Sequence, residues 1–510
     1  MGYKEFDIKV PINIHENEIK QLIGSKTRFK KFTFTIVKKS LDARRKSNIF
    51  WQYRIGIVSD EIKGGEKPDI PSLIPDNKKR SKHILIVGTG PSGIFSALLL
   101  LQAGFKVTII ERGGKVEERK ASIDKFEKTG LFDAANNYCF GEGGAGTFSD
   151  GKLTSRTKSI TRERNYIFQQ FIKAGAPDEI FYMTHPHLGS DNLFRITQNL
   201  RKELEEKGCH FHFNTRLEGL KTNGDKVLSV ITSSGNIDAD SFLIATGHSA
   251  FETYRMLMQN KVNFHIKNFA LGFRAEHHQE IINIAQWGLP KIPGIKAAEY
   301  RLTAPQDLNS TVYSFCMCPG GIVVPAAAYA HTNIVNGMSN YSRDSQYANA
   351  AVVVSLNLEK YFGKTVSAIE ALEWLEQLES KFFEFSHGFE APAETISNFL
   401  NNGRNSKLPI SSYPLGLKEA DFNELLPEGL ITPLKNGLKE FCSKIKGYDT
   451  GIILGLESKS SSPIQVERNP ERLNSGYLNL YMVGEGSGWA GGIISSAADG
   501  LKAAQQILVT

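Results

Sequence analysis

Cysteine is scarce in this chain of 510 residues, which has only five thiols. So few cysteines in so long a chain do not make a disulfide framework. Residues 1–7 lack the apolar core that a secretory signal needs, and Phe6 stands where a myristoylation signal needs Ser or Thr. The most apolar stretches, near 94–101 and 483–498, are short and are interrupted or flanked by glycine, which suits buried elements better than a membrane span. We therefore expect a cytoplasmic protein that makes no contact with a membrane.

Internal repeats and low-complexity tracts are also missing, and the positive charge is not spread along the chain. The formal net charge is +7. Residues 1–82 contain 19 Lys and Arg against 10 Asp and Glu, so this segment carries +9 and the remainder carries 7 − 9 = −2. The basic excess therefore belongs to the N-terminal segment alone. At this length the chain exceeds one ordinary core, and we expect two or three lobes.

The N-terminal segment has the alternating pattern of three strands, at residues 6–12, 32–37 and 50–58. These runs predict a small α/β unit. Its lysines and aromatic residues leave two interpretations open. The favoured one is a small domain whose aromatic residues form its own core, and the alternative is a surface that binds RNA. Residues 61–82 are rich in Gly, Pro and charge and are expected to be a linker.

Residues 83–111 carry the most specific pattern in the chain. An apolar run at 83–87 enters a turn with Gly88, Gly90 and Gly93, continues into an Ala- and Leu-rich segment and returns as an apolar run before Glu111. In a strand, glycine turn, helix and second strand of this kind, the glycines allow a tight turn, a close approach to a pyrophosphate and close helix packing. The acid about 20 residues later accepts hydrogen bonds from a ribose. The segment therefore predicts a dinucleotide site.

Two later segments have related patterns. Residues 242–247 form an apolar run that ends in Ala-Thr-Gly, and residues 481–494 form a strand, a glycine-rich turn and the start of a helix. The free N–H groups and the dipole of such a helix end favour negative charge. These segments are separated from residues 83–111 by long insertions, so we expect one nucleotide-binding lobe assembled from three pieces.

The order of these motifs resembles the FAD domain of the glutathione reductase type. More narrowly, the chain resembles the bacterial family of FAD-dependent dehydrogenases, or uncharacterised FAD-utilising proteins, over nearly its whole length. The stretches that carry this second resemblance are 40–46, 140–152, 245–250, 316–321, 461–463 and 484–492.

The resemblance implies FAD as the cofactor and a set of residues that contact it. The first glycine turn would hold the pyrophosphate, Glu111 the adenosine ribose, and the backbone near Leu217 the adenine. The remaining loops would lie along the ribityl chain and the isoalloxazine. The implied cofactor-binding residues are Gly88, Gly90, Pro91, Ser92, Gly93, Glu111, Arg112, Gly144, Ala145, Gly146, Thr147, Leu217, Thr246, Gly247, Gly484, Glu485, Gly492 and Ile493. One departure is that Phe251 and Glu252 stand where the family commonly has Arg-Asp, which puts in doubt any role for a charge after His248.

The fold class expected is α/β, with a Rossmann-like FAD-binding domain assembled from discontinuous segments, an inserted α+β substrate domain and a small N-terminal α/β domain. The expected organisation is a basic N-terminal domain at 1–60, a linker at 61–82, the FAD-binding domain at 83–150, 209–250 and 476–510, an insertion at 151–208 and a substrate or cap domain at 251–475.

Two side chains are candidates for catalysis. His248 follows a nucleotide-contacting strand end and is of the type that donates protons near neutral pH. Lys152 follows a glycine loop and has the charge to stabilise an anionic reduced flavin. For both, a purely structural role is the interpretation that we favour.

Cys316 and Cys318 are spaced CxC beside a Pro-Gly-Gly sequence. They lie far from the first nucleotide helix, so we do not expect a dithiol relay of the glutathione reductase kind. A close approach of their loop to the flavin or substrate is favoured instead. No further Cys or His cluster completes four ligands, so we expect no metal. Arg274 is expected to make an ordinary interdomain ion pair, with contact to an acidic substrate as the alternative.

The function expected is that of an FAD-dependent oxidoreductase, a dehydrogenase or reductase, which acts on a small or medium-sized substrate through the flavin N5. No second glycine motif with a following acid is evident, so a dedicated NADPH domain is not expected, although NADH or NADPH stays open as a transient electron donor. The alternatives are a flavin monooxygenase and an RNA-acting or RNA-binding flavoprotein. The expected partner is a small-molecule substrate, and a nucleic acid bound by the basic N-terminal domain is the less favoured alternative.

Overall fold

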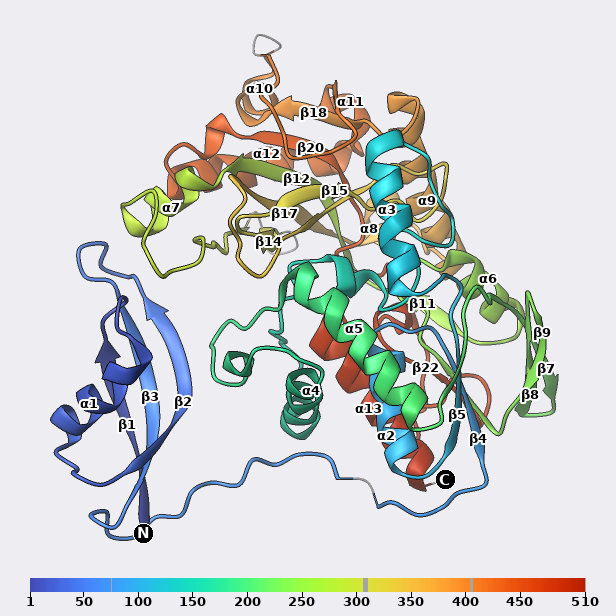
Figure 1. The fold of residues 1–510 in the computed structure, drawn as a ribbon. Coiled ribbons are helices and arrows are strands. Elements are labelled where there is room, and N and C mark those ends of the chain that lie inside the picture. The colour runs from blue at the N-terminus through green and yellow to red at the C-terminus, as the bar shows by residue number, and fades with distance from the viewer. Residues whose placement is uncertain (75, 306–310, 404–406, 510) are drawn as a thin grey trace.

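The computed structural model describes residues 1–74, 76–305, 311–403 and 407–509. Its N-terminal part is a three-stranded antiparallel sheet in the order β1-β3-β2, made of β1 (Gly2–Val10), β2 (Thr33–Asp42) and β3 (Phe50–Ser59). Helix α1 (Glu16–Thr27) lies against this sheet (Figure 1). The three strands expected from the alternating pattern are confirmed.

The aromatic residues of this N-terminal part pack within it. Phe6, Phe29, Phe32, Phe34 and Trp51 surround a buried core of Ile8, Val10, Ile19, Ile23, Tyr53, Ile55 and Ile57. Phe6 and Phe29 meet edge to face, with ring centroids 5.9 Å apart. The aromatic residues therefore contribute to the domain's own core, which is the interpretation favoured from the sequence.

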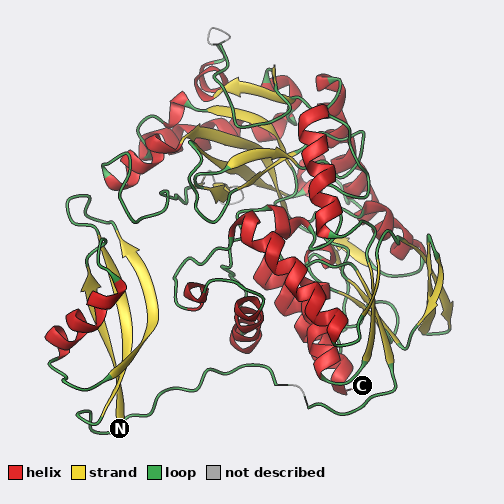
Figure 2. Cartoon of the chain, viewed as in Figure 1, coloured by secondary structure: helices red, strands yellow, loops and turns green. Residues whose placement is uncertain are grey.

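Residues 63–82 contain no helix or strand among the described positions, and they run as an extended loop to the rest of the molecule (Figure 2). A second connection joins the two parts directly. Lys39 in β2 donates its N–H to the Tyr182 carbonyl at 2.7 Å, and its carbonyl accepts from the Thr184 N–H at 2.9 Å. The outer strand of the N-terminal sheet is therefore paired with the segment that contains Thr184.

The central sheet is parallel, with the order β22-β10-β4-β5-β6. Its strands are β4 (His83–Val87), β5 (Lys106–Ile110), β6 (His210–His212), β10 (Ser241–Ile244) and β22 (Leu480–Met482). Strands from three distant stretches of the chain thus lie side by side. The short apolar runs expected at 83–87, before Glu111, at 242–247 and at 481–494 overlap the strands β4, β5, β10 and β22.

Both faces of this sheet are covered, as a parallel sheet of apolar strands requires. Ile84 and Ile86 point to a core formed with α2 (Pro91–Gln102) and α13 (Ile493–Val509). Leu85 and Val87 point the other way, into a core that includes Leu220 and Val230. Those two residues belong to an antiparallel sheet of β7 (Leu217–Asn223), β8 (Lys226–Thr232) and β9 (Gly235–Asp238). The alternation follows from the two-residue period of a strand.

Residues 151–208 add two long helices beside this lobe. Helix α4 (Thr161–Lys173) contacts α13, and α5 (Gly189–Glu206) contacts α2 and the short helix η1 (Ala145–Phe148). Helix α3 (Val116–Thr129) also contacts α5. This segment therefore extends the helical layer of the nucleotide-binding lobe.

The second large sheet has seven strands in the order β13-β14-β17-β12-β20-β18-β19. Its bounds are β12 (Phe269–His278), β13 (Thr303–Pro305), β14 (Thr311–Cys318), β17 (Tyr347–Leu356), β18 (Ala391–Thr395), β19 (Leu417–Glu419) and β20 (Ile452–Glu457). Helix α9 (Ala368–Ser386) contacts β18 and β20, and α12 (Glu428–Lys444) contacts β13, β14 and β17. The mixed α/β fold class is confirmed. Over the described residues, no helix is both long and apolar enough to cross a lipid bilayer.

Candidate functional site

A cavity of about 1260 Å³ lies where the glycine turns after β4, β10 and β22 face strand β14 of the seven-stranded sheet. Its walls come from both lobes. From the nucleotide-binding lobe they include Gly90, Gly247 and Gly492, and from the other lobe they include Tyr313 and Cys316. The carboxyl ends of the parallel strands, where ligands of open α/β sheets bind, therefore open into this cavity.

The turn between β4 and α2 needs glycine at two positions for reasons internal to the protein. A Cβ on Gly88 would lie 2.5 Å from the carbonyl oxygen of Ala245, and one on Gly93 would overlap the carbonyl oxygen of Gly88. Gly90 is different, because its nearest neighbour would be the Gly144 Cα at 4.0 Å. Gly90 is the N-cap of α2, and Pro91 follows it at the first helical position. The free N–H groups of this helix end are suited to an anion.

Glu111 connects three loops at the edge of the cavity. One carboxylate oxygen accepts from the backbone N–H of Thr89 at 3.0 Å and from its hydroxyl at 2.6 Å. The other accepts from the N–H groups of Gly113 at 3.1 Å and Gly141 at 3.3 Å. Glu111 is buried yet lines the cavity. Its carboxylate thus holds the loops together, and its contact with a ribose stays a prediction.

Arg119 of α3 organises the loop that carries Gly144. Its fully buried guanidinium donates to the carbonyls of Asn137, Glu142 and Gly144 at 2.8 Å and of Tyr138 at 3.1 Å. Nothing in the sequence pattern singled out Arg119. The loop depends on it because a loop without regular hydrogen bonds must satisfy its buried carbonyls in another way.

Arg112 forms an ion pair with Glu252, one of the two residues that depart from the family pattern. Glu252 also accepts from the hydroxyl of Tyr329 at 2.5 Å. Arg112 Nη1 is buried without a hydrogen-bond partner among the described residues. Arg112 lines the cavity, so it is tied to α6 (Phe251–Gln259) on one side and faces the ligand space on the other.

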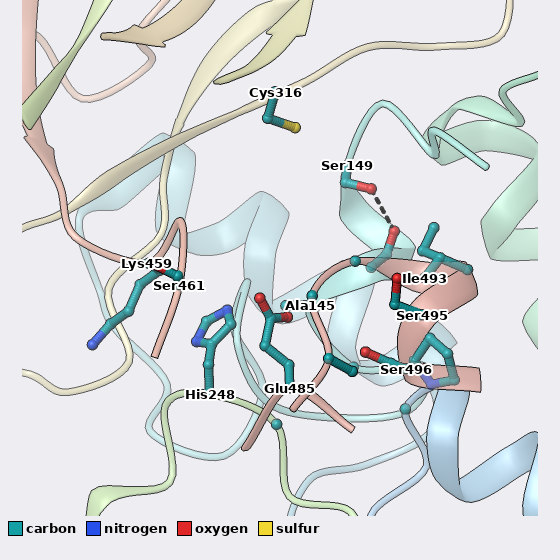
Figure 3. Close-up of a pocket in the computed structure, with 18 of the residues that line it drawn as sticks. Ala145, Ser149, His248, Cys316, Lys459, Ser461, Glu485, Ile493, Ser495 and Ser496 are labelled. Carbon is teal, nitrogen blue, oxygen red and sulfur yellow. Dashed lines mark hydrogen bonds between the residues drawn. The ribbon is translucent and has the colours of Figure 1, made fainter. Parts of the chain in front are cut away.

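Glu485 projects into the cavity between His248 and Ala145 (Figure 3). Burial raises the pKa of its carboxyl to about 7, although the nearby Lys267 ammonium lowers it. Lys267 donates to the Gly488 carbonyl at 2.6 Å. Glu485 therefore exchanges a proton close to neutral pH, and Lys267 is positioned to stabilise its ionised form.

His248 does not have the pKa that the sequence led us to expect. Burial and, secondly, the Lys459 ammonium lower the pKa of its imidazole to about 3. Its Nδ1 lies 2.6 Å from the Ser249 hydroxyl. The proposal of a proton donor near neutral pH is wrong for this environment, because the ring is already neutral there.

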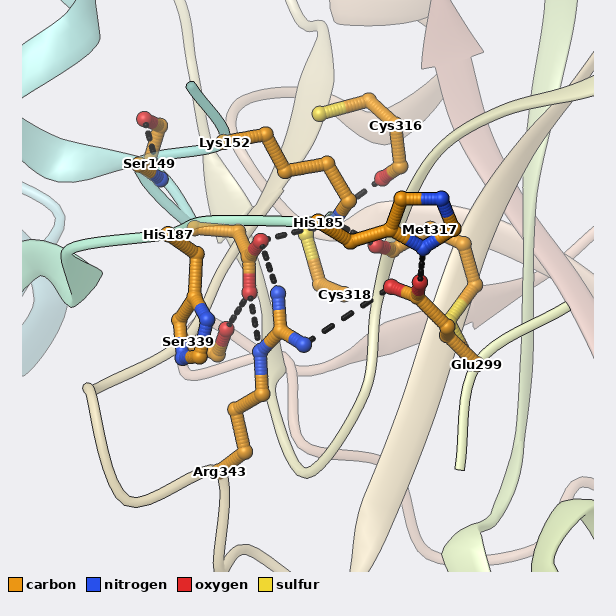
Figure 4. Close-up of polar contacts among 12 residues, drawn as sticks. Ser149, Lys152, His185, His187, Glu299, Cys316, Met317, Cys318, Ser339 and Arg343 are labelled. Atoms are coloured by element: carbon orange, nitrogen blue, oxygen red, sulfur yellow. Dashed lines mark hydrogen bonds and ion pairs between the residues drawn. The ribbon is translucent and has the colours of Figure 1, made fainter. Parts of the chain in front are cut away.

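Lys152 lines the cavity wall, but its charge is already paired (Figure 4). Its ammonium lies 2.7 Å from Asp150, which also accepts from Arg343 Nη2 at 2.6 Å, and it donates to the Met317 carbonyl. Burial is the largest single influence and lowers the pKa of Lys152, but the Asp150 carboxylate together with the Cys318 and Cys316 sulfurs raises it above its ordinary value. Lys152 is therefore protonated, and stabilisation of an anionic flavin by it stays a prediction.

The cavity brings together most of the residues expected at the cofactor. Those that line it are Gly88, Gly90, Pro91, Ser92, Glu111, Arg112, Gly144, Ala145, Gly146, Leu217, Thr246, Gly247, Glu485, Gly492 and Ile493, together with His248 and Lys152. Gly93, Thr147 and Gly484 are not among the lining residues. A Cβ on Gly484 would overlap the Ser92 hydroxyl, so this glycine serves the contact between two turns.

Three family models match separate parts of the chain. A model described as "FAD binding domain" matches residues 81–242, one described as "FAD-dependent protein, C-terminal domain-like" matches 268–460, and a "Domain of unknown function (DUF8436)" matches 3–58. An uncharacterised protein of Clostridium beijerinckii is 37% identical over 517 residues, which cover 98% of this chain and 96% of that protein. The chain belongs to the family of this Clostridium protein. It is an FAD-dependent oxidoreductase.

Other similarities to the flavoenzyme are more distant. A D-amino acid dehydrogenase of Neisseria meningitidis is 32% identical over 76 residues, which cover 15% of this chain and 18% of that protein. The structure of L-proline dehydrogenase from P. horikoshii has a TM-score of 0.33 at 13% identity, over 84% of this chain and 94% of that one. Glycine oxidase from Bacillus cereus has a TM-score of 0.34 at 11% identity, over 84% and 95%. Similarity at this level says nothing about the substrate of the flavoenzyme.

Several residues of the flavoenzyme's cavity had no signal in the sequence. They are Arg156, Lys267, Glu299, Arg301, Tyr313, Lys459, Ser460, Ser495 and Ser496. Each lies outside the glycine turns, and its place on the wall depends on the packing of the folded chain.

The structure corrects the expectation that Arg274 makes an ion pair between domains. It is fully buried and lies 2.7 Å from Glu457 on the neighbouring strand β20, so its ion pair is within one sheet rather than between domains. Its position inside the sheet keeps it from meeting a substrate directly.

Proposed function

We propose that FAD lies along the cavity with its pyrophosphate at the N-terminus of α2 and its isoalloxazine near η1, Glu485 and strand β14. The turn after β4 leaves open space beside Gly90, and a helix N-terminus favours the negative charge of phosphates. The parallel sheet with its glycine turn supports placement in the glutathione reductase type. The observation that most directly supports this position of FAD is that three glycine turns from distant parts of the chain line one continuous cavity.

The proposed reaction is the oxidation or reduction of a small or medium-sized substrate at the flavin N5. The bound flavin supplies the two-electron chemistry. The chain's own residues then have three tasks: Glu485 holds or accepts a proton, Lys267 compensates its charge, and the walls formed by β14 and α13 exclude water. NADH or NADPH is the proposed transient donor if the substrate is reduced.

We further propose that the substrate is anionic. Arg156 and Arg301 are exposed side chains on the cavity wall, and neither takes part in an ion pair among the described residues. By contrast, Lys152 and Arg343 are compensated by Asp150. Arginines without a protein partner in a ligand space are suited to the planar, bidentate binding of a carboxylate or phosphate.

The test is anaerobic reduction of the bound flavin. The yellow holoprotein is mixed first with NADH and NADPH and then with a panel of metabolites, matched pairs of carboxylates and their uncharged amides among them. We expect bleaching of the flavin absorbance by a nicotinamide or by an anionic member of the panel, and weaker bleaching in Arg156→Ala. A bound flavin that only uncharged compounds bleach would contradict the anionic substrate. Substrate-dependent hydroxylation in air would favour a monooxygenase instead.

A further inference from the structure

The cavity contains a pair of thiols that the proposed function does not use. Cys316 and Cys318 lie at the end of β14, where Cys316 lines the cavity and Cys318 is buried behind it. Figure 3 shows the Cys316 side chain on the opposite side of the pocket from His248 and Glu485. Sequence reasoning set thiol chemistry aside because these residues are far along the chain from the first nucleotide helix. The fold brings them to the same cavity.

A bulge in β14 gives Cys316 its position. Phe315 pairs with Ala351 of β17, and Cys318 pairs with Asn349. An advance of three residues along β14 therefore lies opposite an advance of two residues along β17. Cys316 has a φ of 42°, in the left-handed region that residues other than glycine rarely occupy. Such a conformation persists only where the surroundings hold it, and bulges commonly redirect a side chain beside a functional site.

Two cations hold the bulge in place. Arg274 Nη2 donates to the Cys316 carbonyl at 2.8 Å, and the Lys152 ammonium donates to the Met317 carbonyl. Arg274 Nη2 also lies 3.8 Å from Cys318 Sγ. Lys152 thus joins the Asp150 carboxylate to the backbone between the two cysteines. Arg274, which is too deeply buried to meet a substrate, therefore helps to position the two thiols.

The same surroundings shift the pKa values of the two thiols in opposite directions. A hydrogen bond from Cys318 lowers the pKa of Cys316 despite its burial, and the charges of Lys152 and Arg274 lower it further. For Cys318, the neighbouring Cys316 sulfur and burial raise the pKa. These opposite shifts favour ionisation of the sulfur that faces the cavity over ionisation of the buried one. A thiolate beside a thiol is the arrangement of a reactive dithiol.

We propose that Cys316 and Cys318 form a second redox centre, a dithiol and disulfide pair that exchanges two electrons with the FAD in the cavity. This inference rests on the proposed position of the flavin. Oxidation forms the S–S bond and releases two electrons and the proton of Cys318. With one further proton from solvent, these convert FAD to FADH₂. In the reverse direction FADH₂ cleaves the S–S bond and becomes FAD.

The spacing of the pair permits this bond. Two residues apart on a regular strand, the Cα atoms are separated by roughly 6.6 Å, from a rise of about 3.3 Å per residue. Disulfides span Cα separations of about 4.4–6.8 Å.

The decisive experiment is an anaerobic reductive titration of the air-oxidised holoprotein with dithionite. The wild-type protein is expected to take up four electrons per flavin, two for FAD and two for the disulfide. Cys316→Ser and Cys318→Ser are each expected to take up only two. A wild-type protein that takes up two electrons per flavin would overturn the proposal. Failure of FAD binding is recognised separately, as missing flavin absorbance before any dithionite is added.

Thiol counting tests the pair without the flavin. After treatment of the apoprotein with a mild thiol oxidant and denaturation, the wild-type protein should have lost two of its five free thiols. Cys139→Ser is the matched control, because Cys139 lines the same cavity but donates to the Ala326 carbonyl rather than to a thiol. This control should lose the same two thiols, whereas Cys316→Ser should lose none. Five thiols retained by the wild-type protein would overturn the pair.

Cys316→Gly is a control that removes the sulfur while keeping the backbone conformation. Glycine adopts the left-handed conformation of residue 316 without strain, so the bulge should survive in this variant. It should bind as much FAD as the wild-type protein and take up two electrons per flavin. Uptake of four electrons by Cys316→Gly would contradict the role of this sulfur.

Discussion

Gly144 and Gly90 lie so close that a Cβ on Gly144 would be 3.0 Å from the Gly90 Cα. The two residues belong to different loops, one after α3 and one at the start of α2, and both line the cavity. A pyrophosphate at the N-terminus of α2 would therefore lie beside both loops. The small separation explains why position 144 is glycine, whereas a Cβ on Gly90 would meet no protein atom closer than 4.0 Å.

The glycines of the first turn should separate folding from cofactor binding. In Gly93→Ala the new Cβ overlaps the Gly88 carbonyl, and such overpacking destabilises a protein by about 1–3 kcal/mol. In Gly90→Ala nothing is closer than 4.0 Å, so the apoprotein should lose no more than about 1 kcal/mol, through the poorer N-cap. Thermal unfolding of the apoproteins measures the loss of stability in each variant. Titration with FAD measures how tightly each variant binds the cofactor. Equal stability of the two variants would contradict these assignments.

Arg119 should be necessary for the loop that carries Gly144. Arg119→Met leaves at least four buried carbonyls without their donor, which we expect to cost on the order of 3 kcal/mol or more and to abolish FAD retention. Lys120→Met is the control on the same helix, because Lys120 forms an exposed pair with Asp124 and should change stability by less than about 1 kcal/mol. Urea denaturation of both variants makes the comparison. Similar losses in both would show that the loop does not depend on Arg119.

The pH dependence of the flavin should follow Glu485 and not His248. With a pKa of about 7, Glu485 is protonated below neutral pH and ionised above it. With a pKa lowered to about 3, His248 stays neutral throughout. Because an ionised carboxylate disfavours the extra electrons on a nearby flavin, the flavin should become harder to reduce as the pH rises through 7. Equilibration with a redox dye at several pH values measures this.

In a plot of the flavin reduction potential against pH, Glu485→Gln should lose the change of slope near pH 7, and His248→Gln should keep it. A change of slope that disappears in His248→Gln and persists in Glu485→Gln would reverse the assignment.

The N-terminal domain should be dispensable for the cofactor. None of the described lining residues precedes Val87, so deletion of residues 1–60 should leave the flavin content per chain unchanged. Since the domain's aromatic residues pack in its own core, we also expect no retardation of RNA by the full chain at physiological salt. A salt-dependent RNA shift that is lost on deletion would support the nucleic-acid alternative. Loss of flavin on deletion would show that the pairing of Lys39 with Thr184 supports the cavity.

Local patterns predicted strands in the N-terminal domain and in the nucleotide-binding lobe. The run at 83–87 is β4, and the alternating run at 32–37 lies at the start of β2, because short apolar or alternating runs bounded by turns are typical of strands. Glycine spacing likewise indicated the turn at Gly88. These features depend on neighbours within a few residues.

Properties set by distant parts of the chain were not predictable. The neutral state of His248 depends on burial beside Lys459, and the position of Cys316 depends on a bulge against β17 and on the contact of Lys152 with the Met317 carbonyl. Arg119 serves a loop about 20 residues away along the chain. Sequence spacing holds no signal for such contacts, because they arise only when the chain is folded.

The central claim, that a single FAD lies across the three glycine turns, is tested most directly by native mass spectrometry of the apoprotein with excess FAD. The wild-type protein should gain the mass of one FAD per chain. Gly90→Arg should gain none, because its side chain fills the open space at the start of α2 while the nearest protein atom to its Cβ is 4.0 Å away. A wild-type protein that binds no FAD, or a Gly90→Arg variant that binds it fully, would contradict the account.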